Sequence, residues 1–318
     1  MEPSSPGLTL LSSEALVGAL SLAMDREFPA WGVLLDPGPA PEWPFFEKWL
    51  DEGRHGSLSY MERTALRRRE MRLGYPGMRT LIIALLPHDP RSMEEPPAEK
   101  TVRIARYAIG PDYHLLFEQA FGRVLSAVQS FLPSGEAPLI KADHGALLEK
   151  SLARRAGLGA IGKNTLLIRP GSGSYFTIGS LLLRTPLPAR IGPYGASDIC
   201  GGCSRCIAAC PTGALEAPYR LDARRCLSYL TIERPGEDRE GLRRDKGGGW
   251  LFGCDLCQEV CPYNASTSEK SGERGLGVFF VDPGSSLEDL GDLRREHGAL
   301  SRVSRSRLAR RLQEINGG

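Results

Sequence analysis

The segment CGGCSRCIAACPTGAL, from Cys200 to Leu215, contains four cysteines in eleven residues, and a proline follows the fourth. The other four cysteines lie downstream, between positions 226 and 261, and none lies in the first 199 residues. Disulfide frameworks usually spread their cysteines through a small secreted domain. Eight cysteines gathered in 62 residues of a 318-residue chain therefore indicate metal binding.

The cysteine spacing favours iron–sulfur clusters. The run C-x2-C-x2-C-x3-C-P is that of bacterial ferredoxins, whose fourth cysteine ligates the second of two clusters. The later segment CDLCQEVCPYN has the same ending, and Cys226 is the remaining thiol that completes its set. Zinc is the alternative, since paired C-x2-C units also build tetrahedral sites. We expect two [4Fe-4S] clusters, one on Cys200, Cys203, Cys206 and Cys261, the other on Cys210, Cys226, Cys254 and Cys257.

Composition excludes several classes of protein. The chain is 41% hydrophobic and 25% charged, as in ordinary globular proteins, and its net charge of +2 does not demand a polyanionic partner. No apolar run approaches the roughly 20 residues that a membrane helix needs. The N-terminus lacks the basic start and long apolar core of a secretory signal. We expect a soluble, cytoplasmic monomer without membrane contact.

The long region before the first cysteine exceeds what a ferredoxin needs, so we expect the clusters to feed electrons to another site. Periodicity and turn signals predict alternating helices and strands, which favours an α/β or α+β sheet domain. Helices are predicted over 12–24, 45–53, 113–132 and 144–157, and strands over 31–36, 80–86, 103–110 and 138–143. The segment 164–183 is predicted to form a hairpin with PGSGS at its turn.

The segment RAGLGAIGK places glycines at 157, 159 and 162. They follow a predicted helix rather than a strand, which is the wrong context for a dinucleotide-binding loop. Two interpretations remain. The glycines either form turns or let the backbone approach a large ligand closely.

Several segments together resemble the epoxyqueuosine reductase family. They are DHGALLEKSLARRAGLGAIGKNTLLIRPGSGSYFTIGSLLL, the two cysteine runs, CLSYLTIE, WLDEGRHGSLSYMER, YPGMRTLIIAL and ARYAIGPDYH. The resemblance covers roughly residues 10 to 315. It implies a cobalamin-dependent, two-cluster enzyme of tRNA modification that reduces the epoxide of epoxyqueuosine to the alkene of queuosine at the wobble position.

The family resemblance also implies a layout. Residues 1–188 would bind base-off cobalamin and substrate, residues 189–265 would form a ferredoxin-like double-cluster module, and residues 266–318 would form a short basic helical tail. The clusters would pass electrons to cobalamin from a reduced flavodoxin- or ferredoxin-type donor. The tRNA would bind through its anticodon region.

Asp143 is the expected proton donor, because opening an epoxide leaves an alkoxide and the family has an acidic residue here. Its alternative role is to cap a helix beginning at His144. Tyr107 is expected to lie near the substrate. Alternatively, its ring packs in the core with its hydroxyl hydrogen-bonded. Asp112 and His114 also match the family pattern, and we rank His114 lower. The residues expected to bind cofactor are Arg106, His144, Gly157, Gly159, Gly162, Lys163 and Asn164.

Two arginine-rich segments, 63–72 and 294–315, bear on RNA binding. Arginine clusters supply phosphate contacts, although a solvated helix face has the same composition. The tail is shorter than is usual in the family, which places the tRNA assignment in question more than the cofactor assignment. The alternatives are a related cobalamin and iron–sulfur reductase of an organohalide or small epoxide, and a non-catalytic electron carrier of ferredoxin type.

Overall fold

The elements of the fold come from residues 6–88, 102–194, 198–234, 249–265, 279–281 and 285–316, which are those that this computed structural model describes. The helices are α1 Pro6–Glu27, α2 Trp43–Asp51, α3 Ser59–Arg63, α4 Ala65–Arg69, α5 Met71–Gly74, α6 Tyr113–Val128, α7 Glu149–Arg155, α8 Arg205–Ala208, α9 Leu227–Ile232, α11 Leu256–Glu259, α13 Leu287–Glu296 and α14 Arg305–Asn316. The strands are β1 Ala30–Leu35, β2 Thr80–Pro87, β3 Val102–Ile104, β4 Leu139–Ala142, β5 Ala160–Ile161, β6 Leu167–Ile168, β7 Phe176–Leu183, β8 Leu215–Ala217, β9 Arg220–Leu221, β10 Trp250–Phe252 and β11 Phe279–Val281. Short 3-10 helices are η1 Arg106–Ala108, η2 Gln129–Phe131, η3 Ala223–Arg225 and η4 Gly298–Arg302.

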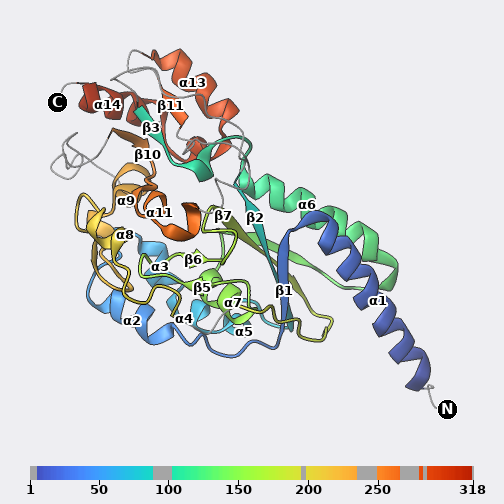
Figure 1. The fold of residues 1–318 in the computed structure, drawn as a ribbon. Helices are drawn as coiled ribbons and strands as arrows, with labels where there is room; N and C mark the ends of the chain where they lie inside the picture. The colour runs from blue at the N-terminus through green and yellow to red at the C-terminus, as the bar shows by residue number, and fades with distance from the viewer. Residues whose placement is uncertain are drawn as a thin grey trace.

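A four-stranded sheet in the order β1-β2-β7-β4 forms the centre of the N-terminal region (Figure 1). Each neighbouring pair in it is antiparallel. Ile82 on β2 pairs with Val33 on one side and Leu181 on the other, and it is fully buried. Because both faces of β2 are covered, its segment 81–86 is apolar throughout rather than alternating.

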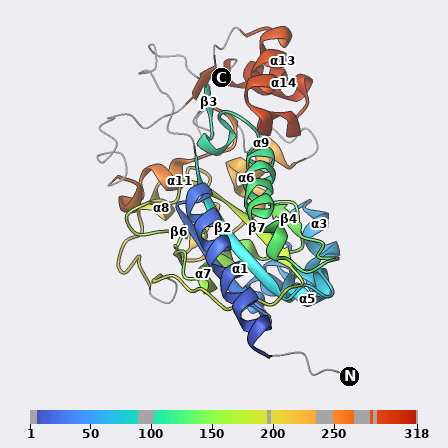
Figure 2. The ribbon, with the colours of Figure 1, turned by 90° about the vertical axis from the view of Figure 1, so that its right-hand side faces the viewer.

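Helices α1 and α6 lie side by side along one face of the sheet (Figures 1 and 2). Phe28, which follows α1, contacts Phe117 and Phe121 of α6, with ring centroids 5.9 and 4.8 Å apart. The opposite face of the sheet packs against α7, where Leu152 and Ala153 are buried. The mixed helix and strand content expected from the sequence is therefore confirmed.

Three local predictions are wrong. The helix predicted over 144–157 begins only at Glu149, as α7, and residues 144–148 are irregular rather than helical. The predicted strand over 103–110 ends at Ile104 and gives way to η1. Segment 164–183 does not form a hairpin, because β6 pairs with β5 whereas β7 pairs with β2 and β4. An isolated bridge between Arg169 and Gly173 is what remains near the PGSGS turn.

The cysteine-bearing region folds back onto the N-terminal region. Strand β10 pairs in parallel with β3, and Trp250 and Phe252 are fully buried there. Helices α8, α9 and α11 lie on the same side of the molecule (Figure 1). The middle of the segment between Cys226 and Cys254 lies outside the described residues.

The C-terminal residues are part of the main core. Leu290 of α13, Leu300 of η4 and Leu308 of α14 are buried in the same hydrophobic cluster as α1 and α6. Helices α13 and α14 pack against each other, and α14 also contacts β10. The domain boundaries expected at 188 and 265 stay a prediction, but the described part of the tail is not a loose appendage.

Gly179 gives a direct test of this packing. A Cβ at Gly179 on β7 would lie 2.2 and 2.3 Å from ring atoms of Phe117 on α6, so the ring or the sheet would have to move. We expect Gly179→Ala to destabilise the fold by about 1–3 kcal/mol. The matched control is Gly122→Ala in α6, where a Cβ meets no atom within 4 Å. It should stabilise the fold by up to ~1 kcal/mol in a urea titration. Equal stabilities for the two variants would contradict this packing.

Candidate functional site

The eight cysteines lie on loops and short helices of one module. Cys200 and Cys203 precede α8, Cys206 lies in it, and Cys210 follows it. Cys226 is the N-cap of α9, and the other three cysteines lie around α11. All eight are partly buried and form no disulfide.

The thiols that raise one another's pKa values belong mostly to the same expected set, and the assignment of ligands to the two sets stays a prediction. Burial raises the pKa of the Cys261 thiol, and the nearby charges of Cys200 and Cys203 raise it further. Burial likewise raises the pKa of the Cys254 thiol, and Cys226 adds to this effect. A thiol that resists ionisation in this way is one that a bound cation must stabilise as thiolate. One link crosses between the sets, since Cys206 also acts on Cys257.

The donor set suits iron–sulfur clusters. Each set supplies four thiols, which is the ligand number of a [4Fe-4S] cluster. Within the described ranges, no three metal-binding side chains converge on one ion-sized point. A cluster spaces its ligands around a cube of atoms rather than around one ion, so the fit rests on the number and grouping of the thiols.

The loop after β5 supports the cysteine loops. The backbone N–H of Lys163 points at Cys200 Sγ at 3.5 Å, and its ammonium donates to the Cys203 carbonyl at 2.9 Å. Asn164 donates to the Cys257 carbonyl at 3.5 Å. Lys163 and Asn164 were expected to bind cofactor, and the structure places both against the cysteine loops. Their contact with cobalamin stays a prediction.

The three glycines before this loop are closely packed. A Cβ at Gly157 would lie 2.1 Å from the Gly192 carbonyl oxygen, and its φ is +70°. At Gly159 it would lie 2.6 Å from the Ile168 carbonyl oxygen, and at Gly162 2.4 Å from the Ile168 side chain. Close approach within the chain explains all three glycines, and a ligand contact by them remains untested.

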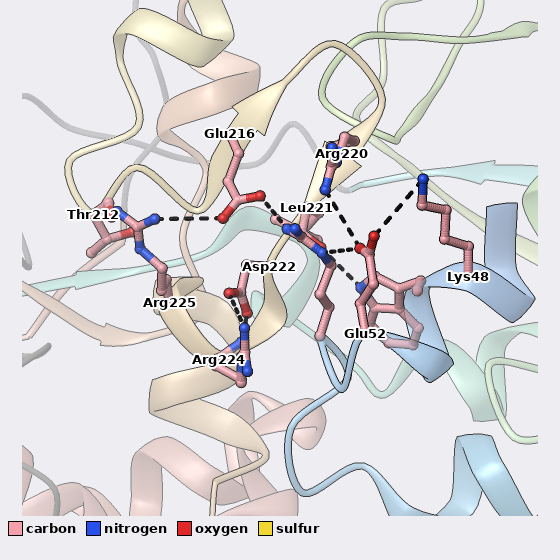
Figure 3. A network of polar contacts seen from close by, with 11 residues as sticks. Lys48, Glu52, Thr212, Glu216, Arg220, Leu221, Asp222, Arg224 and Arg225 are labelled. Carbon is pink, nitrogen blue, oxygen red and sulfur yellow. Dashed lines mark hydrogen bonds and ion pairs between the residues drawn. The ribbon is translucent and has the colours of Figure 1, made fainter.

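A polar network joins the N-terminal region to the cysteine module (Figure 3). Arg54, which follows α2, pairs with Glu52 and with Glu216 on β8. Arg220 on β9 lies 3.5 Å from Glu52, and Trp49 donates to the Leu221 carbonyl at 2.9 Å. These contacts fix the β8–β9 hairpin, and hence the turn before Cys226, relative to α2.

Asp143 directly follows β4 and contacts Arg302 of the C-terminal tail. Its Oδ2 accepts a hydrogen bond from the Tyr113 hydroxyl at 2.8 Å and from Arg302 at 3.1 Å. Its φ is +61°, a left-handed conformation that is uncommon for a non-glycine residue. Because α7 begins only at Glu149, Asp143 does not cap that helix, and the capping alternative is wrong.

Tyr107 lies on η1 beside this carboxylate. Its ring contacts Tyr113 edge-on at 6.2 Å and Phe252 at 6.1 Å. Burial raises the pKa of Tyr107, with the nearby Asp143 charge adding to the effect and Arg302 opposing it. Burial and Asp143 also raise the pKa of Tyr113. Both phenols therefore keep their protons at neutral pH.

The remaining expected residues have varied surroundings. Arg106 stacks over the Tyr175 ring at 4.2 Å, and its backbone N–H donates to Asp255, which follows Cys254. His144 is exposed, with its Nδ1 2.7 Å from the Ala142 carbonyl oxygen. His114 pairs with Asp112, which caps α6. Asp112 therefore has a structural role at the start of α6, whereas the His114 ring also stacks on Tyr113 at 4.2 Å and lies 5.4 Å from the His144 ring.

Glu149 and Lys150 lie on the other side of Asp143. The Asp143 N–H donates to Glu149 Oε1 at 2.9 Å, and burial, with the Asp143 charge, raises the pKa of Glu149 to about 8. Lys150 is exposed at the surface, yet the surrounding protein desolvates it and lowers its pKa, against the charges of Glu149, Asp143 and Cys257. Lys150 therefore lies near both the Asp143 loop and the Cys257 loop, and its Nζ donates to the Thr165 carbonyl at 2.8 Å.

Sequence reasoning missed three members of this site. Tyr113 stood in the quoted ARYAIGPDYH segment but was not singled out. Glu149 was assigned to the interior of a helix. Arg302 was counted as one of the basic residues of the tail, and no local pattern could show that it reaches Asp143.

Glu149 predicts a pH dependence of stability. Its pKa is raised from 4.5 to about 8 on folding, so between these values the folded protein binds a proton that the unfolded chain does not. The contribution of Glu149 to the free energy of unfolding therefore falls as the pH rises from about 4.5 to about 8. Glu149→Gln keeps an acceptor oxygen for the Asp143 N–H and removes the titration. The variant should match the native protein near pH 5 and be about 1–2 kcal/mol more stable at pH 8.

The measurement is anaerobic urea unfolding of both proteins at the two pH values. Glu47→Gln, which changes an exposed carboxylate on α2, is the control and should shift stability equally at both. A Glu149→Gln difference that does not change with pH would contradict the assignment.

Two family models match separate parts of the chain. Residues 68–137 match the model described as "Epoxyqueuosine reductase QueG, DUF1730". Residues 199–264 match the model described as "4Fe-4S double cluster binding domain", so the cysteine module is an iron–sulfur cluster domain. The sequence prediction of iron–sulfur clusters is confirmed at this level. Within the described residues, no helix is both long and apolar enough to span a bilayer.

Solved structures share the fold. A selenomethionine-labelled epoxyqueuosine reductase superposes with a TM-score of 0.77 at 22% identity, covering 96% of this chain and 81% of the other. The epoxyqueuosine reductase of Streptococcus thermophilus gives a TM-score of 0.73 at 24% identity, covering 94% and 80%.

Curated relatives carry the family assignment. The chain is 40% identical to the epoxyqueuosine reductase of Pseudomonas aeruginosa over 222 residues, which are 69% of this chain and 60% of that protein. The match to the Xanthomonas campestris enzyme likewise spans 61% of its length. The Leadbetterella byssophila enzyme is 37% identical over 254 residues, covering 80% of this chain and 81% of that one. By this match over most of both sequences, the chain belongs to the epoxyqueuosine reductase family.

Proposed function

We propose that this protein reduces epoxyqueuosine to queuosine in tRNA, using two [4Fe-4S] clusters and cobalamin. The observation that carries the proposal is the Asp143 carboxylate, which meets Tyr113 and Arg302 beside an iron–sulfur cluster module. A solved relative was crystallised with an epoxyqueuosine-modified tRNA stem loop. Another relative, from Bacillus subtilis, was solved with an aspartate-bearing catalytic loop swung out of the active site.

The eight cysteines are proposed as the ligands of the two clusters, in the sets already given. Cys257, in the second set, lies close enough to act electrostatically on Lys150, which in turn responds to Asp143. The second cluster would therefore lie near Lys150 and Asp143, and the first would lie near Lys163, which contacts Cys200 and Cys203. A reduced flavodoxin- or ferredoxin-type protein is the proposed electron donor. We further propose a cytoplasmic monomer.

Several buried polar groups suit contact with a large polar cofactor. Ser180 Oγ on β7 and the Tyr175 hydroxyl are buried without a hydrogen-bond partner among the described residues. Buried polar atoms of this kind normally have partners. Ser180 pairs across the sheet with Lys141, two residues before Asp143. We propose that such groups, with Lys150 and Arg106, hold cobalamin, which when bound supplies the two electrons of the reduction.

The protein's own contribution is to place a proton. Opening an epoxide leaves an alkoxide, and an acid within hydrogen-bond reach lowers that barrier. Asp143 would deliver the proton from Oδ1, since Oδ2 already accepts from Tyr113 and Arg302. Tyr107 and Tyr113, both protonated at neutral pH, would exclude water and hold the substrate beside the carboxyl group.

An arginine-lined pocket supports tRNA as the partner. It encloses about 300 Å³ between α13 and α14 and is lined by Gly291, Arg294, Arg295, Ser301 and Arg305. A Cβ at Gly291 would lie 3.4 Å from Arg305 Nη1 and 3.8 Å from Arg295 Nη1, so two guanidinium groups converge there. Arg295 pairs with Asp292, whereas the Arg305 side chain has no polar partner among the described residues. Converging cations with one carboxylate form a favourable site for a backbone phosphate.

The first prediction concerns catalysis. Asp143→Asn keeps one acceptor oxygen for Tyr113 and Arg302, but its amide cannot supply the acid proton, so we expect a loss of about 10²- to 10⁴-fold in rate. The assay is anaerobic single turnover on an epoxyqueuosine stem loop, with the nucleosides weighed by mass spectrometry. Asp51→Asn, at an exposed position of α2, is the control and should convert substrate at the native rate.

Each outcome of that assay has a meaning. Loss of one oxygen from the nucleoside by the native protein alone supports the proposal. Native protein that binds clusters and cobalamin but leaves the nucleoside unchanged would overturn it in favour of a reductase of another small substrate. Protein that binds clusters without cobalamin would indicate an electron carrier.

The second prediction concerns RNA binding. Arg305→Gln should weaken stem-loop binding about 3- to 10-fold and lower the slope of log affinity against log salt by about one. Arg184→Gln, at an exposed position beyond the end of β7, is the matched control and should change neither quantity. Fluorescence anisotropy at several salt concentrations measures both. An Arg305→Gln protein with native affinity and native slope would rule out a phosphate in the pocket.

A further inference from the structure

Arg302 joins three parts of the chain that are far apart in sequence. It is the last residue of η4, and its Nη1 lies 3.1 Å from Asp143 Oδ2 at the end of β4. Its Nη2 lies 2.9 Å from Glu233 Oε1, at the C-terminal end of α9. The guanidinium therefore bridges one carboxylate of the sheet domain and one of the cluster module.

Helix α9 carries this bridge to a cluster ligand. Cys226 is the N-cap of α9, and Glu233 is its C-cap. A second tail residue, Arg307, donates to the Ile232 and Leu230 carbonyl oxygens at 3.0 and 3.3 Å. Arg307 thus satisfies carbonyl groups at the C-terminal end of the helix that Cys226 caps, and Arg302 pairs with the side chain of its C-cap residue, where cations are favourable.

The tail also packs closely against the turn that carries Tyr107. The Gly298 N–H donates to the Gly110 carbonyl at 3.1 Å. A Cβ at Gly298 would lie 2.6 Å from the Asp112 Cβ, so only glycine permits this approach. Arg302 consequently reaches Asp143 from a fixed backbone rather than from a free end.

The surroundings keep Arg302 charged. Burial alone would lower its pKa, but the charges of Asp143 and Glu233 act against burial, and its pKa is raised. Its side chain is 33% exposed, so the pair is partly shielded from solvent. Charge-assisted bonds of this kind are stronger and more directional than those of neutral groups.

Asp143 needs such support. Its left-handed backbone conformation is strained, and strained residues persist where surrounding contacts determine them. Tyr113 and Arg302 both bind Oδ2, and Oδ1 accepts no hydrogen bond from the described residues. One carboxyl oxygen is fixed and the other is available to the substrate.

We propose that Arg302 is a positioning residue for Asp143, so that the tail completes the proton-delivery site and ties it to α9 of the cluster module. This inference rests on the proposed function, because it assigns Arg302 a task in the proton transfer by Asp143. A positioning role differs from an RNA-binding role, in which Arg302 would contact a phosphate and its substitution would weaken stem-loop affinity.

The test uses the full-length holoprotein with Arg302→Gln, Arg302→Lys, Asp143→Asn and the double variant Asp143→Asn with Arg302→Gln. Each is assayed for single-turnover rate at saturating stem loop and for stem-loop affinity. Arg302→Gln should lose about 10- to 100-fold in rate with affinity unchanged, and Arg302→Lys should recover part of the loss. The double variant should be no slower than Asp143→Asn alone, because contacting residues that act as a unit are not additive.

A second readout does not depend on activity. Amide hydrogen exchange of residues 142–146 should be faster in Arg302→Gln than in the native protein, and intermediate in Arg302→Lys. Arg184→Gln is the control and should exchange at the native rate. If native protein converts no epoxyqueuosine, the proposed function fails, and this exchange measurement still decides whether Arg302 holds the Asp143 loop.

Three results would overturn the inference. The first is a double variant whose fold-loss in single-turnover rate equals the product of the losses of Asp143→Asn and Arg302→Gln. The second is an Arg302→Gln defect confined to RNA affinity, which would make Arg302 an RNA contact. The third is native exchange of residues 142–146 in Arg302→Gln.

Discussion

The site depends on how eight thiols are held in a module whose hydrophobic cluster is shared with the N-terminal region, where Leu58 and Ala105 pack with residues of α9 and β10. Its helices α8, α9 and α11 are short, and the cysteine loops between them could not be stable alone. Support comes from outside the module, from Lys163 and Asn164 on one side and from Arg54 on another. Strand β10 joins the module to β3, and the tail covers the end of α9. A rigid frame of this kind suits redox clusters, whose distance to an electron acceptor must stay constant.

The candidate site is assembled where these supports meet. Asp143 comes from the sheet domain, Tyr107 and Tyr113 from the η1–α6 turn, and Arg302 from the tail. Residues of the tail contribute both to the central core, through Leu300, and to the site. The tail therefore lines the candidate site and also presents a basic surface. Different arginines of the tail serve these two roles. Arg302 and Arg307 face inward to carboxylate and carbonyl oxygens, whereas Arg305 lines an open pocket.

Local patterns in the sequence predicted the parts of this structure that local physics determines. The cysteine spacing predicted the cluster module, and the apolar run at β2 predicted a buried strand. Predictions failed where tertiary contacts override local preference. Residues 144–148 have helical composition, but the Asp143 N–H bonds to Glu149 and the Tyr75 hydroxyl accepts from the Ala146 N–H, so the helix begins later. The hairpin prediction failed because β7 finds longer partners in β2 and β4. The pairing of Arg302 with Asp143 spans 159 residues and leaves no trace in either local sequence.

The central claim is that the eight cysteines hold two [4Fe-4S] clusters beside Asp143. The most direct test is to quantify iron, acid-labile sulfide and zinc in protein purified and reconstituted without oxygen. The account predicts roughly eight iron and eight sulfide per chain, with a broad visible absorbance that dithionite bleaches. About two zinc per chain, with neither sulfide nor visible absorbance, would contradict it and remove the electron source on which the proposed reduction depends.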